Sequence, residues 1–248
     1  MRKKNIFEQL TKVLHDSNGE FRVLEHQVPV ETQMEYFKNS NLLRSILPID
    51  DKTDYEQLAA ELYNPTASLE FKKQILSTLA ITQETKSYRL LEKYMQEPEK
   101  ELKDWAHMAL IESRVTLESE FSDEKQIYIS TGMGGKGNKL RYYILLLSSS
   151  SNPFLDYQRQ VIEREFEYAL HKFDGEIEEL TIQDQYVEIV ILAPIHADIK
   201  RILENVLSEC NQYGDFISNT ITVTNVKKLT KKEISEIIKK HEGRRSGN

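Results

Sequence analysis

Four of the nine glycines of this 248-residue chain fall within six positions, in the run Gly132-Met133-Gly134-Gly135-Lys136-Gly137. Glycines leave backbone N–H groups accessible, and accessible N–H groups beside cations can hold a phosphate or an acidic partner. We therefore predict a contact surface formed by the glycines and the three neighbouring cations: Gly132, Gly134, Gly135, Lys136, Gly137, Lys139 and Arg141. The alternative is a mobile turn with solvated charges.

The same letters match G-x-G-x-x-G, but none of three nucleotide-binding loops fits the context. A dinucleotide loop requires a helix after the glycines, whereas residues 140–147 have the pattern of a strand. A Walker loop requires Gly-Lys followed by Ser or Thr, whereas Gly137 is followed by Asn138-Lys139-Leu140. A kinase glycine loop does lie between two strands, but the H-R-D and D-F-G segments are absent from the sequence. The spacing therefore predicts no nucleotide cofactor.

No catalytic or metal-ligating constellation accompanies the glycine cluster. The six histidines are scattered, and the single cysteine, Cys210, cannot form a zinc cluster. Cys210 falls on the apolar stripe of a predicted helix, which indicates a buried structural thiol. Glu176, Glu178 and Glu179 are interpreted as a solvated face. We predict no catalytic residue, no metal, no cofactor and no enzymatic activity.

The first half of the chain has helical periodicity. From residue 54 to 121 the apolar side chains recur in short one-sided stripes, each of which needs a neighbour to be buried. Two of these stripes have the same i, i+4, i+8 spacing and lie 31 residues apart in the sequence: Phe71, Ile75 and Leu79, then Leu102, Ala106 and Leu110. Stacked helices are the expected arrangement.

The helix–turn–helix pattern that contains PEKELKDWAHMALIESR resembles a HEAT-like repeat, in which an acidic turn precedes a helix with alanines at close contacts. The resemblance covers residues 54–121, or about two units. It implies an extended helical surface suited to protein partners. Because a stable solenoid usually needs three or more repeats, an unrelated small helical bundle is the alternative.

From Gln126 onward the pattern changes to strands that alternate with helices. Between Leu140 and Val226 the order of elements is β-α-β-β-α-β, and the short Asp184-Gln185 turn makes the middle two strands a hairpin. This order resembles the ferredoxin-like α+β plan. The resemblance implies a fold and carries no function with it.

The end of the chain is basic. After Asn219 there are eight Lys or Arg residues and three Glu residues. In the last predicted strand Ile221 and Val223 alternate with threonines, as expected of a strand with one buried face. Thr230 followed by Glu233 predicts a capping box at the start of a C-terminal helix.

The sequence thus predicts a two-domain protein. Residues 1–124 form an all-α, HEAT-like domain that is clearest over 54–121, and residues 125–248 form a ferredoxin-like α+β domain with a C-terminal basic helix. Residues 1–125 carry 17 basic and 23 acidic side chains, whereas the rest carries 16 and 17. The acidic balance therefore belongs to the helical half.

Composition places the chain among soluble proteins, with 39% hydrophobic and 29% charged residues. The longest apolar run is six residues, Tyr142–Leu147, far below the roughly 20 that a membrane-spanning helix needs. A single cysteine fits a reducing compartment. We expect a cytoplasmic protein without a membrane partner.

The leading hypothesis for function is a non-enzymatic protein–protein interaction or scaffold protein with a protein partner still to be identified. A second hypothesis is an RNA- or ribosome-associated protein that binds nucleic acid through the Lys/Arg loop and the basic tail. The net charge of −7 and the lack of an RNP1 pattern count against it. A third, a small-ligand regulatory domain, rests only on the ferredoxin-like plan.

Overall fold

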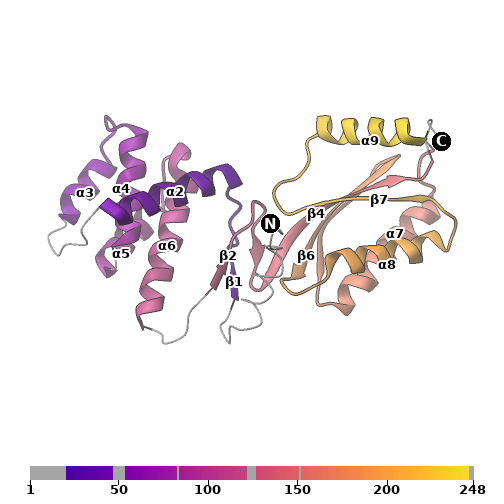
Figure 1. The fold of residues 1–248 in the computed structure, drawn as a ribbon, viewed down its shortest axis with the longest axis horizontal. Coiled ribbons are helices and arrows are strands. Elements are labelled where there is room, and N and C mark those ends of the chain that lie inside the picture. The colour runs from indigo at the N-terminus through magenta and orange to yellow at the C-terminus, as the bar shows by residue number, and fades with distance from the viewer. Residues whose placement is uncertain (1–20, 47–53, 83, 122–126, 151, 246–248) are drawn as a thin grey trace, which may run out of the picture. The chain divides into compact units, whose positions relative to one another are not determined.

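The computed structural model describes residues 21–46, 54–82, 84–121, 127–150 and 152–245 (Figure 1). The chain divides into two compact units. The first, here called the helical unit, comprises Met1–Arg22 and Val30–Ile129, and the second, the α+β unit, comprises Val23–Pro29 and Ser130–Asn248. The predicted domain boundary at residues 124 and 125 lies outside the described residues.

The helical unit is the helical part that the periodicity predicts, but the prediction that residues 1–124 are all-α is wrong, because a short strand at Phe21–Val23 belongs to a two-stranded sheet. Its elements are α2 (Val30–Ile46), α3 (Tyr55–Leu62), α4 (Leu69–Ile81), α5 (Thr85–Tyr94), the 3-10 turn η1 (Lys100–Leu102) and α6 (Lys103–Phe121), with a small sheet of β1 (Phe21–Val23) and β2 (Ile127–Ile129). Capping side chains fix where helices begin. Ser68 Oγ accepts a hydrogen bond from the Phe71 amide at 3.2 Å, and Asp54 does the same for α3.

Polar contacts in the helical unit join α2 to α6. Glu112 of α6 accepts hydrogen bonds from Tyr36 Oη at 2.5 Å, Ser40 Oγ at 2.6 Å and Arg44 Nη2 at 2.9 Å. Burial, with the negative charge of Glu112 beside it, raises the pKa of Tyr36 well above its usual value. Because three donors surround one carboxylate, Glu112 stays compensated although it is largely buried.

One predicted core position in the helical unit is wrong. Ile75 and Leu79 are buried, but Phe71 is 45% exposed. In this first turn of α4 the buried side chain is instead Lys72, whose Nζ is paired with Glu99. Lys72 lies on the same face of α4 as the buried Leu76 and Leu79, and the ion pair compensates its buried charge, so the predicted stripe holds in the core only from Ile75 onward.

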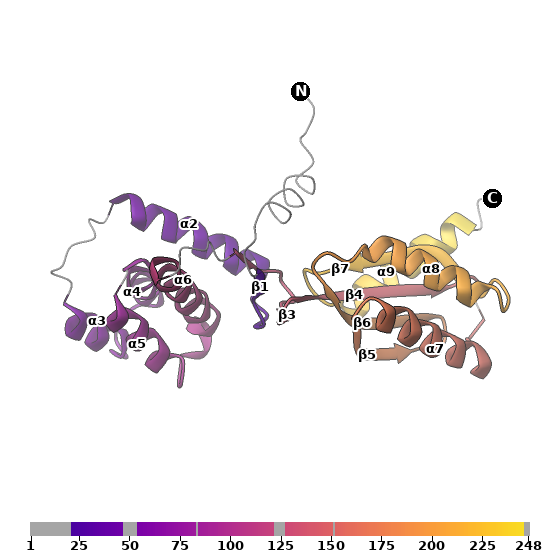
Figure 2. The ribbon, with the colours of Figure 1, turned by 90° about the horizontal axis from the view of Figure 1, so that it is seen from below.

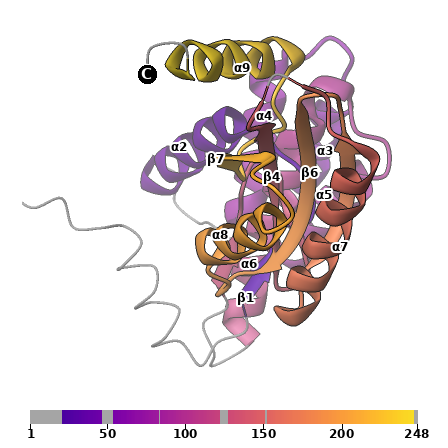
Figure 3. The same ribbon diagram turned by 90° about the vertical axis from the view of Figure 1, so that its right-hand side faces the viewer.

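The α+β unit contains an antiparallel sheet. Its elements are β3 (Gly135–Lys136), β4 (Lys139–Ser148), α7 (Asp156–Lys172), β5 (Glu176–Ile182), β6 (Tyr186–Pro194), α8 (Ile199–Asn211), β7 (Ile217–Thr224) and α9 (Lys231–Arg245). The strand order is β7-β4-β6-β5, and every neighbouring pair is antiparallel. In Figure 3, β7, β4 and β6 follow one another in this order. The predicted hairpin of the middle two strands is confirmed.

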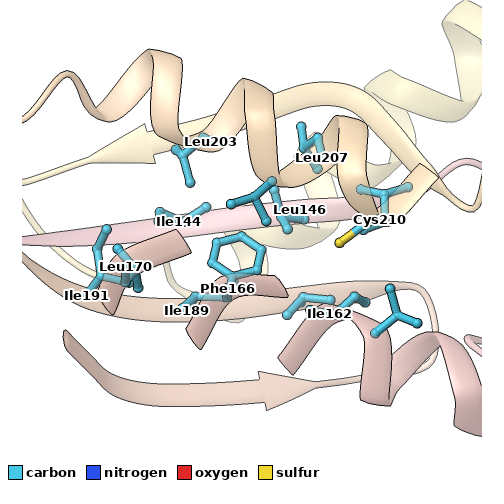
Figure 4. Close-up of a cluster of buried hydrophobic side chains, with 14 of the residues drawn as sticks. Ile144, Leu146, Ile162, Phe166, Leu170, Ile189, Ile191, Leu203, Leu207 and Cys210 are labelled. Carbon is cyan, nitrogen blue, oxygen red and sulfur yellow. The ribbon is translucent and has the colours of Figure 1, made fainter. Parts of the chain in front are cut away.

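Strand β4 is covered on both faces, which explains its unbroken apolar run. Ile144 and Leu146 face α7 and α8, where they pack with Phe166 in the larger core (Figure 4). Tyr143 and Leu145 belong to a second cluster with Ile234 of α9. Helices α7 and α8 lie side by side on one face (Figure 2), whereas α9 lies across the other (Figure 1). A strand buried on both faces needs no polar alternation.

Two local predictions in the α+β unit are confirmed. Cys210 is fully buried in the larger core, and burial raises the pKa of its thiol to about 12. The capping box of α9 forms as expected: the Glu233 amide donates to Thr230 Oγ1 at 3.3 Å, and the Thr230 amide donates to the Glu233 carboxylate at 2.8 Å. Both features follow from local spacing.

Candidate interaction site

The glycines of the predicted contact surface lie where backbones cross. A Cβ on Gly132 would stand 2.0 Å from the carbonyl oxygen of Val226, and one on Gly134 would stand 2.6 Å from that of Glu25. A Cβ on Gly135 would meet the carbonyl oxygen of Lys139 at 2.1 Å. These close approaches require glycine for packing within the unit, whatever the segment binds.

The remaining glycine makes the turn between β3 and β4. Gly137 has φ +60° with open space where a Cβ would be, and it is the first of two residues in the hairpin turn. A positive φ at this first position alone is the requirement of a type II′ turn. The Gly137 carbonyl accepts a hydrogen bond from the Val23 amide at 3.1 Å, so the N-terminal segment 23–29 is joined to the turn.

Two of the three predicted cations are paired with carboxylates of β5 and the turn before it. Lys139 Nζ lies 2.7 Å from Glu176 and 3.2 Å from Asp174. Arg141 contacts Glu178 through Nε and, at 2.8 Å, through Nη2. The hydrogen bonds from Arg141 lower the pKa of Glu178, and the Glu178 carboxylate in turn raises the pKa of Arg141.

The glutamates of β5 are exposed, as the sequence predicts, and they are also paired with cations. Register explains the pairing with β4, because Leu192 of β6 pairs with both Arg141 and Glu176. Side chains on one face of β4 can therefore reach β5 across β6. Lys136 is the exposed cation of the three. The binding role of the seven residues stays a prediction. Two of the three cations among them, Lys139 and Arg141, already form ion pairs within the chain.

A groove between α8 and β7 is a second candidate that the sequence did not reveal. It has a volume of about 950 Å³, within the range of ligand-binding clefts. Apolar side chains from β4, α8 and β7 form its floor: Tyr142, Leu203, Leu207, Ile221 and Val223. Val223 is 40% exposed. Lys200 and Glu204 of α8 line the groove as well and are highly exposed.

Asn211 at the end of α8 fixes the groove at the start of β7. Its side chain accepts from the Ile217 amide at 3.0 Å and donates to the Ile217 carbonyl at 2.9 Å. At the other end of α8, the Asp198 side chain accepts from the Arg201 amide at 3.1 Å and caps the helix. Both ends of the groove wall are therefore held by side chain to backbone hydrogen bonds.

Among the described strands, none pairs with the outer edge of β7 beside this groove. Strand β6 pairs with β4 along residues 139–147, so β3 and β7 share the other side of β4. Among the described residues β7 pairs with β4 alone. Its sequence, ISNTITVT, contains no charged residue. A register shift against Leu146–Ser148 leaves Ile221–Thr224 as the regular stretch. The groove and this open edge together are called the β7 groove below.

Other site types gain no support from the described part of the chain. Residues 21–46, 54–82, 84–121, 127–150 and 152–245 contain no group of three or more His, Cys, Asp or Glu side chains placed to hold a metal. Within the same ranges, no helix is long and apolar enough to cross a membrane. In the described part of the α+β unit, the structure adds to the sequence the groove between α8 and β7 and the edge position of β7.

Comparison with known proteins identifies no family. No family model matches the chain. No curated protein matches it either.

Several solved structures show a distant likeness. A candidate transposase from Deinococcus radiodurans R1 shares 12% identity over 42% of this chain and 90% of its own, with a TM-score of 0.35. A REP-associated tyrosine transposase bound to a REP hairpin shares 9% over 39% and 61%, with a TM-score of 0.32. The intact alpha subunit of aIF2 from Pyrococcus abyssi shares 13% over 80% and 66%, with a TM-score of 0.29. At TM-scores this low, these likenesses carry no argument about the chain.

Proposed function

We propose that this chain is a non-enzymatic protein–protein interaction protein whose binding site is the β7 groove. The observation that carries the proposal is an uncharged edge strand, with no second strand partner among the described residues, beside a groove with an apolar floor and a polar rim. An edge strand offers unpaired N–H and C=O groups to an added strand, and a neighbouring groove receives alternate side chains of that strand. The ligand class is therefore an extended protein segment with apolar residues at alternate positions.

The fold that presents this site is proposed to be ferredoxin-like. The strand order β7-β4-β6-β5 with antiparallel neighbours supports this assignment. For the helical unit we propose the HEAT-like arrangement, supported by the packing of α4 against α5 and α6. Both assignments concern scaffolds, and neither contributes to the choice of ligand. A reducing, cytoplasmic location remains part of the proposal and is compatible with a free, buried Cys210.

Selection from a random peptide display library tests the function. The full chain is immobilised at a density low enough that copies do not meet, and enriched peptides are compared between wild type and Val223→Lys. We expect alternating apolar residues in the enriched peptides and at least tenfold weaker binding to Val223→Lys, because the lysine places a charge on the groove floor.

Val226→Lys is the matched control for this selection. Val226 is 44% exposed, similar to the 40% of Val223, but it lies beyond β7 and does not line the groove. Peptides that bind wild type and Val226→Lys equally, and Val223→Lys weakly, support the proposal. Peptides that bind all three alike contradict it.

The other two functions are separate outcomes. RNA binding predicts retention on RNA at about 50 mM salt that falls steeply as salt rises. A small-ligand regulatory role predicts that a nucleotide or amino acid raises the melting temperature of wild type and not that of Val223→Lys. Either result without peptide binding would replace the proposed function.

A further inference from the structure

We propose that strand β7 pairs with strand β7 of a second copy of this chain, with the two α8 helices beside the junction, so that the two sheets join into one. This inference rests on the proposed function, because it names the partner of the same site. The incoming segment must be uncharged and must carry apolar residues at alternate positions. Strand β7 meets this description, with Ile221 and Val223 on the groove side and threonines between them.

Symmetry makes β7 a suitable partner for itself. Two copies of a strand that pair antiparallel are related by a two-fold axis perpendicular to the sheet, and this operation keeps each face on its own side. The α8 helices of both copies then lie on the same face, next to the junction. Each α8 covers part of the other copy's groove.

The size of the groove favours a second copy over a lone peptide. A paired strand lies in the plane of the sheet and sends only alternate side chains toward the helical face. The groove beside α8 has about 950 Å³, and a helix about 10 Å across that arrives with the strand fills more of it. A second copy of the chain brings both a strand and a helix on this side of the sheet.

Three charged side chains line the groove, Lys200, Glu204 and Asp215, and the first two can complement those of a second copy. Lys200 and Glu204 are one turn apart on α8, with side chains 83% and 59% exposed and a separation of 3.7 Å. When two α8 helices lie antiparallel across a two-fold axis, Lys200 of one copy faces Glu204 of the second copy and the reverse. The second half of the chain is also nearly neutral, with 16 basic and 17 acidic residues after residue 125, so two copies of it repel little.

The opposite edge of the sheet explains why assembly stops at two. Strand β5 carries Glu176, Glu178 and Glu179, and charged side chains on an edge oppose strand addition. Within the described sheet of the α+β unit, pairing through β7 uses the uncharged edge of each copy, and the edge on the opposite side is β5 with its three glutamates. The result is a closed dimer rather than a fibre.

Sedimentation equilibrium of the full chain over a range of concentrations tests the proposal. We expect a monomer–dimer equilibrium in wild type and in Val226→Lys. In Val223→Lys the dissociation constant should rise at least tenfold, with an unchanged far-UV circular dichroism spectrum to show that the variant is folded. A dimer that Val223→Lys leaves intact overturns the proposal, since the contact would then lie elsewhere.

Charge exchange at α8 gives an independent test. Lys200→Glu should weaken the dimer severalfold because two glutamates then face each other, and adding Glu204→Lys to it should restore wild-type affinity. Failure of the double variant to recover contradicts the antiparallel arrangement of α8.

Cysteine cross-linking locates the axis. Cys210 is buried, so single cysteines introduced at Thr220, Thr222 or Thr224 report on β7. The position nearest the axis should form an intermolecular disulfide, whereas Thr181→Cys on β5 should not. A cross-link through β5 and none through β7 overturns the proposal.

The proposal and the function it rests on can fail separately. A chain that is monomeric at every concentration, and still selects peptides that Val223→Lys loses, has a strand-accepting site without self-association. A monomeric chain that selects no such peptides has neither.

Discussion

The two edges of the sheet in the α+β unit are built differently. Strand β5 has three glutamates in seven residues, and two of them are paired with cations that reach across from β4. Strand β7 has no charge in eight residues and lies beside a groove with an apolar floor. Proteins protect exposed edges with charge, so the uncharged edge is the one that we propose binds a partner.

The largest expected effect comes from removing the protection of β5. The triple variant Glu176→Thr, Glu178→Thr, Glu179→Thr gives the sheet two uncharged edges, so pairing no longer closes at a dimer. We expect concentration-dependent large assemblies in static light scattering. The control is Lys139→Ala with Arg141→Ala and Lys228→Ala, which removes the ion pairs of all three glutamates and keeps the glutamates. If the control variant assembles as strongly as the triple variant, the loss of the ion pairs causes the assembly. The proposed difference between the two edges is then wrong.

Alanine substitutions in the glycine segment 132–137 test whether its glycines are required for the close approach of the backbones beside β3. Gly134→Ala places a Cβ 2.6 Å from the Glu25 carbonyl oxygen at φ +64°, and we expect a loss of about 2–3 kcal/mol in the free energy of unfolding. Gly137→Ala shares the positive φ but meets open space, so about 1 kcal/mol is expected. Urea denaturation measures both. Equal losses would show that the close approach contributes nothing.

The next largest effect is expected from the ion pair between Arg141 of β4 and Glu178 of β5. Arg141→Ala removes the contacts with Glu178 and the hydrogen bond to the Met133 carbonyl at 2.8 Å. Since Glu178 is partly exposed and keeps the weaker attraction of Lys136 and Lys228, we expect a loss of about 1–2 kcal/mol in urea denaturation. Lys136→Ala, at the exposed cation, should change stability by less than about 0.5 kcal/mol. A large effect at Lys136 would reverse the ranking of the three cations.

The same ion pair makes the free energy of unfolding depend on pH. The hydrogen bonds from Arg141 lower the pKa of Glu178 in the folded state from its ordinary value of 4.5, so the ionised form stabilises the fold above that value. We expect wild type to exceed Glu178→Gln by about 1 kcal/mol at pH 7. The difference should shrink as the pH falls below 4.5 and through the lower folded pKa. A difference that is constant from pH 7 to pH 2 contradicts the ionic contribution.

The smallest effect is expected at the open edge itself. Val223→Lys affects a side chain that is already 40% exposed, so at concentrations where wild type is monomeric the free energy of unfolding should change by less than about 0.5 kcal/mol. Thermal melts at low protein concentration measure this. A large loss would mean that Val223 supports the monomer, and that the two edges differ less than their sequences suggest.

Local spacing predicts the parts of this structure that depend on near neighbours. The capping box of Thr230 and Glu233, the buried Cys210 and the order of elements from β4 to β7 all follow from periods of two or 3.6 residues. Features that depend on register do not. The pairing of Arg141 with Glu178 needs the intervening strand β6 to be placed first.

The candidate site shows the same limit. The alternation of Ile221 and Val223 indicates a buried face, but the sequence does not say that β7 is an edge strand or that α8 leaves these side chains partly uncovered. The glycine cluster is visible in sequence because of its composition. Its close packing against Glu25 and Val226 involves residues about 110 and 90 positions away, and no local pattern reveals such partners.

The position of α9 has a consequence for how the chain is made. Tyr143, Leu145 and Val190 on one face of the sheet are covered by a helix that follows every strand in the chain. Because synthesis on the ribosome proceeds at about 5–20 residues per second, this apolar face stays uncovered for a time on the order of seconds before α9 has been made. During that interval the nascent sheet presents to chaperones a surface that the finished protein never shows.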